Sequence, residues 1–128
     1  MSGLTDRLAR ACLAATFVYG GARAARDPGN RPAQAARIGF PEDPRLVQAN
    51  GAAMVLGGVA MALGITPRLA AGGLIASLIP TTVAGHPFWL DRDPLARAQN
   101  LTQLAKNLGL AGGLLLVATN RSGRIRPG

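Results

Sequence analysis

Six side chains of the sequence could bind a polar ligand, and they lie near the ends of long apolar segments. They are Tyr19, Arg23, His86, Trp89, Lys106 and Asn107. If the apolar segments are consecutive membrane-spanning helices, alternate connections bring these six residues to one face of the membrane. Histidine, lysine and asparagine can hydrogen-bond a carbonyl acceptor while an aromatic ring packs on the ligand. A quinone has two carbonyls and a flat ring, so the six residues form a candidate quinone site at the lipid boundary.

The same residues also fit a simpler interpretation, an aromatic belt with cations that extend toward the lipid head groups. The sequence leaves these two interpretations open. The single histidine, His86, and the single cysteine, Cys12, exclude two-histidine metal sites and disulfides within one chain. We therefore expect no metal site and no covalently bound cofactor, and quinone is the one cofactor that the residues suggest.

The composition favours a membrane protein, whose apolar helices would position these residues. Only 16% of the 128 residues are charged, against 48% hydrophobic, whereas about a quarter of a soluble domain is charged. Residues 46–67 and 69–90 are each uncharged for 22 residues, which as a helix is about 33 Å and matches a hydrocarbon core of about 30 Å. Residues 11–22 and 107–120 are shorter and reach spanning length if Arg7, Arg10 and Lys106 lie inside helices.

Start and stop signals divide the chain into helices. Aspartate or threonine before proline, an N-cap followed by the first helical residue, occurs at Asp43, Thr66 and Asp93. Gly64 ends the second helix before a hairpin that includes Arg68. The predicted helices are 5–22, 44–64, 67–85 and 94–119, with a short capped helix from Asn30 to Gly39. The fold class is an all-α, polytopic membrane four-helix bundle, a single domain over 1–128 with a loop helix between helices 1 and 2. An alternative for the first helix is a secretory signal peptide.

Small residues at every fourth position predict how the helices pack, because close approach drives helix association in lipid. They are Ala49, Ala53 and Gly57, then Gly72 and Ala76 with Gly73 and Ser77, and finally Ala105, Gly109 and Gly113. Pro80 should kink its helix, with Ser77 and Thr81 satisfying freed backbone groups. Gln48 and Asn50 are expected to hydrogen-bond between helices.

The distribution of lysine and arginine bears on how the chain is oriented in the membrane and on what it binds. The net charge is +8, but the cations flank apolar segments without interleaved aromatic residues, so we expect membrane lipid as a partner and no nucleic acid. Four spans place both termini on one side of the membrane. Lysine and arginine counts divide almost evenly between the two sides, and we favour cytoplasmic termini.

The sequence resembles the DoxX family of small four-helix bacterial membrane proteins from about Arg7 to Val117. The resemblance rests on the hairpin 63–68, on the segment 79–89 with its His-x-Phe-Trp motif, and on Lys-Asn-Leu at 106–108. It implies a bacterial plasma-membrane bundle. Some relatives are subunits of quinone-linked sulfur oxidoreductases, and others belong to oxidative-stress complexes with soluble redox enzymes. Many members have an acidic residue near the start of the second helix, where this chain has Gln48 and Asn50.

Three functions remain open at this point. The first is a quinone-interacting or anchoring subunit of a membrane redox complex, so the chain is at most one subunit of a quinone-linked oxidoreductase. The second is a non-catalytic scaffold that recruits a soluble oxidoreductase. The third is a small transporter, which is disfavoured because Lys106 is the one ionisable residue expected at depth. A soluble or membrane redox partner and a homo-oligomer are both compatible with the sequence.

Overall fold

The structure is a computed structural model that describes residues 3–85 and 88–119. Every element in these residues is helical, which confirms the all-helical class. The elements are α1 (Gly3–Arg26), α2 (Arg31–Ala36), α3 (Pro44–Leu63), α4 (Pro67–Gly85), the 3₁₀ helix η1 (Phe88–Leu90) and α5 (Pro94–Thr119). The bounds of α3, α4 and α5 lie within one residue of the expected ranges.

The expected N-caps act at the starts of two helices. The backbone N–H of Arg45 donates to Asp43 Oδ1 over 2.9 Å, and that of Ala96 donates to Asp93 Oδ2 over 3.1 Å. The side chain of Arg45 also bonds Asp43, and these bonds hold the pKa of Asp43 below its ordinary value. At the other end of α3, Gly64 has a φ of 78°, the left-handed conformation that glycine tolerates best. Local chemistry therefore sets these helix ends.

Two elements between the first and third long helices differ from expectation. α1 runs to Arg26, beyond the predicted end at 22, because arginines in the last turn are favourable at a helix C-terminus. α2 ends at Ala36, before Gly39, and Asn30 makes no side-chain cap bond. The backbone of Asn30 is in the right-handed helical region, whereas a capping residue needs an extended backbone for its side chain to reach the helix N–H groups. The 3₁₀ helix η1 was not expected.

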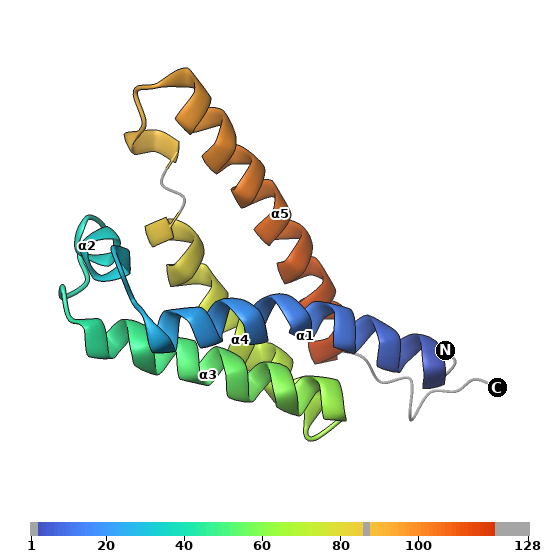
Figure 1. The fold of residues 1–128 in the computed structure, drawn as a ribbon. Helices are drawn as coiled ribbons and strands as arrows, with labels where there is room; N and C mark the ends of the chain where they lie inside the picture. The colour runs from blue at the N-terminus through green and yellow to red at the C-terminus, as the bar shows by residue number, and fades with distance from the viewer. Residues whose placement is uncertain (1–2, 86–87, 120–128) are drawn as a thin grey trace.

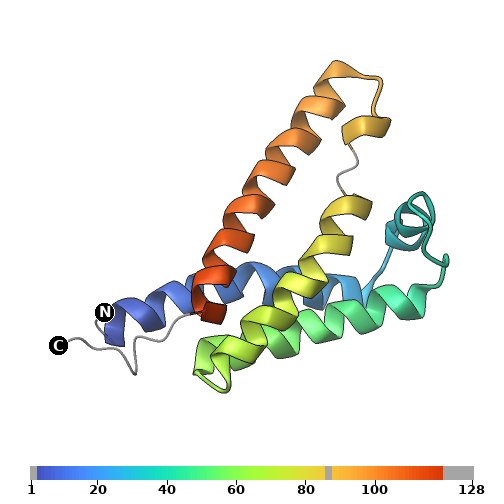
Figure 2. The same cartoon turned by 180° about the vertical axis from the view of Figure 1, so that it is seen from behind.

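The helices form two pairs that are inclined to each other (Figures 1 and 2). α1 lies along α3, and α4 forms a hairpin with α5 through η1. The pairs meet at the end of the molecule where α3 turns into α4, and they diverge toward the opposite end, where α2 lies. The start of α1 and the end of α5 lie on the same side of the molecule.

The core occupies the end where the two pairs meet. Its four largest fully buried side chains come from four different helices: Phe17 of α1, Met61 of α3, Leu74 of α4 and Leu114 of α5. The divergence of the pairs thus starts from a packed contact that involves all four long helices.

Close backbone approach joins α1 to α3 at two glycines. A Cβ atom built on Gly51 would lie 2.6 Å from the carbonyl oxygen of Gly21, and one built on Gly21 would lie 2.5 Å from the carbonyl oxygen of Gly51. Real Cβ contacts are essentially never this short, so the packing of these two helices requires glycine at both positions. About two turns along α3, Gly58 lies against a side chain of α1, since a Cβ added there would be 2.8 Å from Val18 Cγ2.

The predicted small-residue stripes are wrong for most positions. Ala49 and Ala53 are exposed, and Cβ atoms added at Gly72, Gly73 and Gly109 would meet open space. Among the expected positions, Gly57 contacts Leu74 and Gly113 contacts Leu13. The buried stripe on α3 is instead Gly51, Met54, Gly58 and Met61. In a helix that is apolar on all sides, a run of small residues does not identify the face that packs.

Pro80 lies inside α4, which continues to Gly85. The hydroxyl of Thr81 donates to the carbonyl of Ser77 over 2.8 Å, and Ser77 is buried. These hydroxyl groups therefore bond within the protein, and their expected role in satisfying the backbone groups that Pro80 frees stays a prediction. The kink itself stays a prediction.

Three of the helices in the described residues, α3, α4 and α5, are long and apolar enough to cross a membrane. α1 has 24 residues but does not belong to this set, because charged residues lie near both of its ends. They are Asp6, Arg7 and Arg10 at one end and Arg23 and Arg26 at the other.

Candidate functional site

A pocket of about 840 Å³ opens where the two helix pairs diverge, beside α2. Its lining combines cations, uncharged polar groups and apolar side chains from α1, α2, α3, α4 and α5. The cations are Arg23, Arg31 and Lys106; the uncharged polar residues include Gln34, Asn50, Thr81 and Gln103; the apolar residues include Phe40, Leu46, Met54, Pro80 and Ala84. Such a pocket suits a ligand with both polar and apolar parts.

Hydrogen bonds between α3 and α4 hold the inner wall of the pocket. The hydroxyl of Ser77 donates to Asn50 Oδ1 over 2.7 Å, and Asn50 Nδ2 donates to Thr81 Oγ1 over 3.1 Å. Together with the bond from the Thr81 hydroxyl to the Ser77 carbonyl, these contacts use both ends of the Asn50 amide. The interhelical role expected for Asn50 is confirmed. Gln48 has a comparable role, since its Nε2 donates to the carbonyl of Ala25 in α1 over 3.3 Å.

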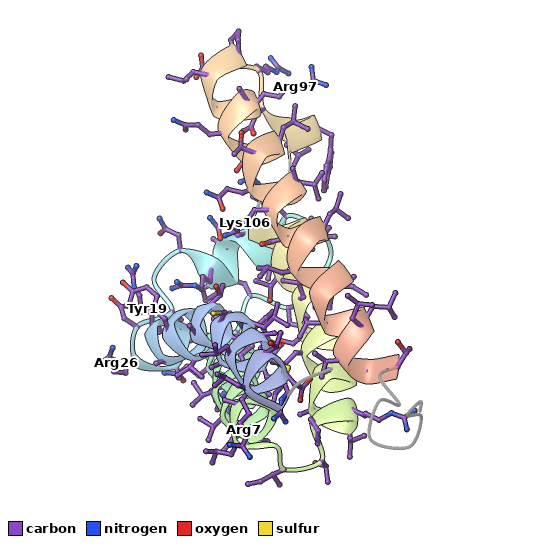
Figure 3. The ribbon with its side chains drawn as sticks, turned by 90° about the vertical axis from the view of Figure 1, so that its right-hand side faces the viewer. Arg7, Tyr19, Arg26, Arg97 and Lys106 are labelled. Carbon is purple, nitrogen blue, oxygen red and sulfur yellow. The ribbon has the colours of Figure 1, made fainter. Side chains whose placement is uncertain are left out.

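Tyr19 and Arg23 form a pair on α1. The guanidinium carbon of Arg23 lies 5.8 Å from the centre of the Tyr19 ring, within the range of a cation–π contact. Tyr19 is 66% exposed and points away from the other helices (Figure 3). Arg23 lines the pocket and Tyr19 does not. The ring is thus placed to orient Arg23 rather than to contact a ligand inside.

Lys106 and Asn107 are adjacent in sequence but have different surroundings. Lys106 lines the pocket together with residues of α2, and Figure 3 shows it on the side of α5 that faces α2. Asn107 is buried, and its Nδ2 donates to the hydroxyl of Thr82 over 2.9 Å. Neighbouring residues of a helix point about 100° apart, so one residue faces the pocket while the other joins α5 to α4.

The remaining two expected site residues are Trp89 and His86. Trp89 is half exposed in η1 and is not part of the lining. His86 lies outside the described residues. Of the six side chains, the structure therefore brings Arg23 and Lys106 to one pocket.

The structural residues expected at the hairpin lie at the opposite end of the molecule. Arg68 Nε donates to the carbonyl of Ala118 over 3.0 Å, which fastens the start of α4 to the end of α5. Gly64 lies against Arg10, because a Cβ added there would be 3.0 Å from Arg10 Nη1. Arg10 itself pairs with Asp6 over 3.3 Å. This arrangement places Arg10 against the hairpin instead of extended toward head groups.

Sequence reasoning missed the contribution of α2 and one residue of α5. Arg31 and Gln34 line the pocket from α2, and Gln103 lines it one turn before Lys106. The spacing of Gln103 and Lys106, three residues apart, puts both on one helix face and could have identified Gln103. The sequence holds no comparable signal for α2, a helix of six residues that buries Pro32.

The described residues that line the pocket offer hydrogen-bond donors and cations and include no carboxylate or thiol. In the described ranges, no group of three His, Cys, Asp or Glu side chains could hold a metal ion. The chemistry that this lining offers is therefore recognition of carbonyl oxygens or anionic groups next to an apolar surface.

An all-helical chain with three helices apolar enough to cross a bilayer is an integral membrane protein. The DoxX family pattern matches residues 6–87, 82 of the 128 residues. The chain belongs to the DoxX family. The match covers α1 to α4 and ends before the Lys-Asn-Leu segment of α5. Comparison with curated proteins and with solved structures found no match.

Proposed function

We propose that this protein is a four-span subunit of a bacterial plasma-membrane redox complex and that it binds a quinone head group in the pocket. α1 supplies the fourth span, since its uncharged middle, residues 11–22, packs along α3 and its charged residues lie toward the ends. One of these charges, Arg10, is neutralised by Asp6. With four spans both termini lie on one side, and we place them in the cytoplasm.

The observation that carries this proposal is the amphipathic lining of the pocket. Gln103 and Lys106 offer N–H donors to the two carbonyl oxygens of a quinone. Met54 and Pro80 provide an apolar wall for the ring, and Phe40 provides an aromatic surface beside it. When bound, the quinone would accept or release the electrons exchanged with a redox partner, while the chain's own residues bind and orient it.

Filling the pocket tests the proposal. Ala84 lines the pocket, and Ala84→Phe is expected to remove most of the quinone that copurifies with the protein, because the added ring occupies the space of the ligand. Ala52→Phe is the matched control, since Ala52 is exposed on α3 and does not line the pocket. Quinone per protein is measured by extraction and mass spectrometry, with helicity and monodispersity checked in both variants. Equal quinone loading in Ala84→Phe and the wild type would overturn the proposal.

A scaffold function is the second candidate, and the shape of the molecule supports it. η1 and the first turns of α5 extend beyond the end of α4 (Figures 1 and 2). Trp89, Leu90 and Leu95 are exposed on this projection. They offer an apolar surface on which a soluble oxidoreductase could dock without any ligand in the pocket.

A further inference from the structure

Three cations from three helices line the pocket, and no carboxylate is among the described residues that line it. Arg23 comes from α1, Arg31 from α2 and Lys106 from α5. The ion pairs Arg10–Asp6 and Arg45–Asp43 both lie elsewhere. In residues 3–85 and 88–119, none of the three pocket cations has a carboxylate partner. No ion pair among the described residues therefore neutralises the charge of these three cations.

Two of these cations are held in place by neighbouring groups. Arg31 Nη1 lies 3.1 Å from the carbonyl oxygen of Asp27 and 3.4 Å from that of Pro28, and it donates to both. Arg23 is held against the ring of Tyr19. Neither contact uses a negative charge. Such cations are preorganised, so an anion that binds them pays little additional cost for ordering side chains.

From this arrangement we infer that the three cations of the pocket form a binding site for a phosphate group. Arginine presents a planar set of donors that matches phosphate oxygens, and lysine adds a point charge. The apolar side chains of Phe40 and Leu46 line the same pocket and are about half exposed. They would carry the acyl chain of an anionic phospholipid whose phosphate contacts the cations. Free phosphate has the same recognition chemistry and is the alternative source.

The test is a binding titration with purified, detergent-solubilised protein from which quinone has been removed. Phosphatidylglycerol is added, and bound lipid per protein is measured by native mass spectrometry. Arg23→Gln and Lys106→Gln are each expected to weaken binding about three- to tenfold, because each removes one charge-assisted contact at a partly exposed site. Lys106→Arg keeps the charge and is expected to bind as the wild type does.

Arg26→Gln is the matched control. It removes the same charge from α1 one turn beyond Arg23, at an exposed residue that does not line the pocket and that points away from the other helices (Figure 3). The inference is overturned if Arg26→Gln weakens binding as much as Arg23→Gln does, or if neither pocket variant changes it. Competition separates the two sources: displacement of the lipid by millimolar inorganic phosphate identifies free phosphate, and retention identifies the lipid.

The phosphate site shares Lys106 and Phe40 with the proposed quinone site, and the two assignments are tested separately because the lipid titration uses protein from which quinone has been removed. Loss of quinone in Ala84→Phe with unchanged lipid binding would support both assignments independently. Unchanged quinone loading in Ala84→Phe would overturn the quinone proposal. Weaker lipid binding in Lys106→Gln, measured separately, would still support the phosphate site.

Discussion

Replacing Gly51 with alanine is expected to destabilise the protein by about 3 kcal/mol, the upper range for inserting a methyl group into a packed interface. The new Cβ would lie 2.6 Å from the Gly21 carbonyl oxygen and 2.9 Å from the backbone nitrogen of Ala25. Both are backbone atoms of α1, so the strain can be relieved only if α1 moves away from α3. Equilibrium unfolding in mixed micelles, followed by helicity, measures the change. Gly21→Ala should behave in the same way.

The chain supplies its own control for this substitution. A Cβ at Gly72 or Gly109 would meet no atom within 4 Å, and alanine is the better helix former by up to about 1 kcal/mol. Gly72→Ala and Gly109→Ala are therefore expected to leave stability unchanged or to raise it. If all four variants lost the same stability, close approach of α1 and α3 would not be what holds the pair together.

These glycines show why the ends of α3, α4 and α5 were predictable and the packing of the helices was not. A helix end depends on a few neighbouring residues, such as Asp43 before a proline or Gly64 in the left-handed region, and this chemistry is visible in the sequence. A packing face depends on the partner helix. α3 has small residues both at 49, 53 and 57 and at 51 and 58, and only the position of α1 selects the second set.

The same distinction applies to the pocket. The order of the helices predicts that Arg23 and Lys106 reach one end of the molecule, and both line the pocket there. The order of the helices cannot resolve which of two adjacent residues faces the pocket. Asn107 was therefore grouped with Lys106, although its side chain bonds Thr82. The contribution of Arg31 was not predictable because a six-residue helix carries no periodic signal that would place it.

The second large effect is expected at Asn50, an uncharged amide bonded to α4 on the inner wall of the pocket. Asn50→Asp is expected to lower stability by about 2 kcal/mol, because a charged carboxylate in an apolar helix is costly and the substitution also removes a donor. The amide nitrogen that donates to Thr81 Oγ1 is lost. The Thr81 hydroxyl already donates to the Ser77 carbonyl, so it cannot donate to the new oxygen without giving up that bond.

The matched change at Gln103 separates the cost of a carboxylate from the cost of this position. Gln103 is half buried in the same pocket, one turn before Lys106, and a carboxylate there gains a nearby cation, so Gln103→Glu should alter stability by less than about 0.5 kcal/mol. Both variants are measured by the same micelle unfolding experiment at neutral pH. Equal losses would mean that any carboxylate in the pocket is costly. A loss confined to Asn50→Asp would show that the uncharged amide, bonded at both ends, is what allows α3 and α4 to pack beneath the pocket in this member of the family.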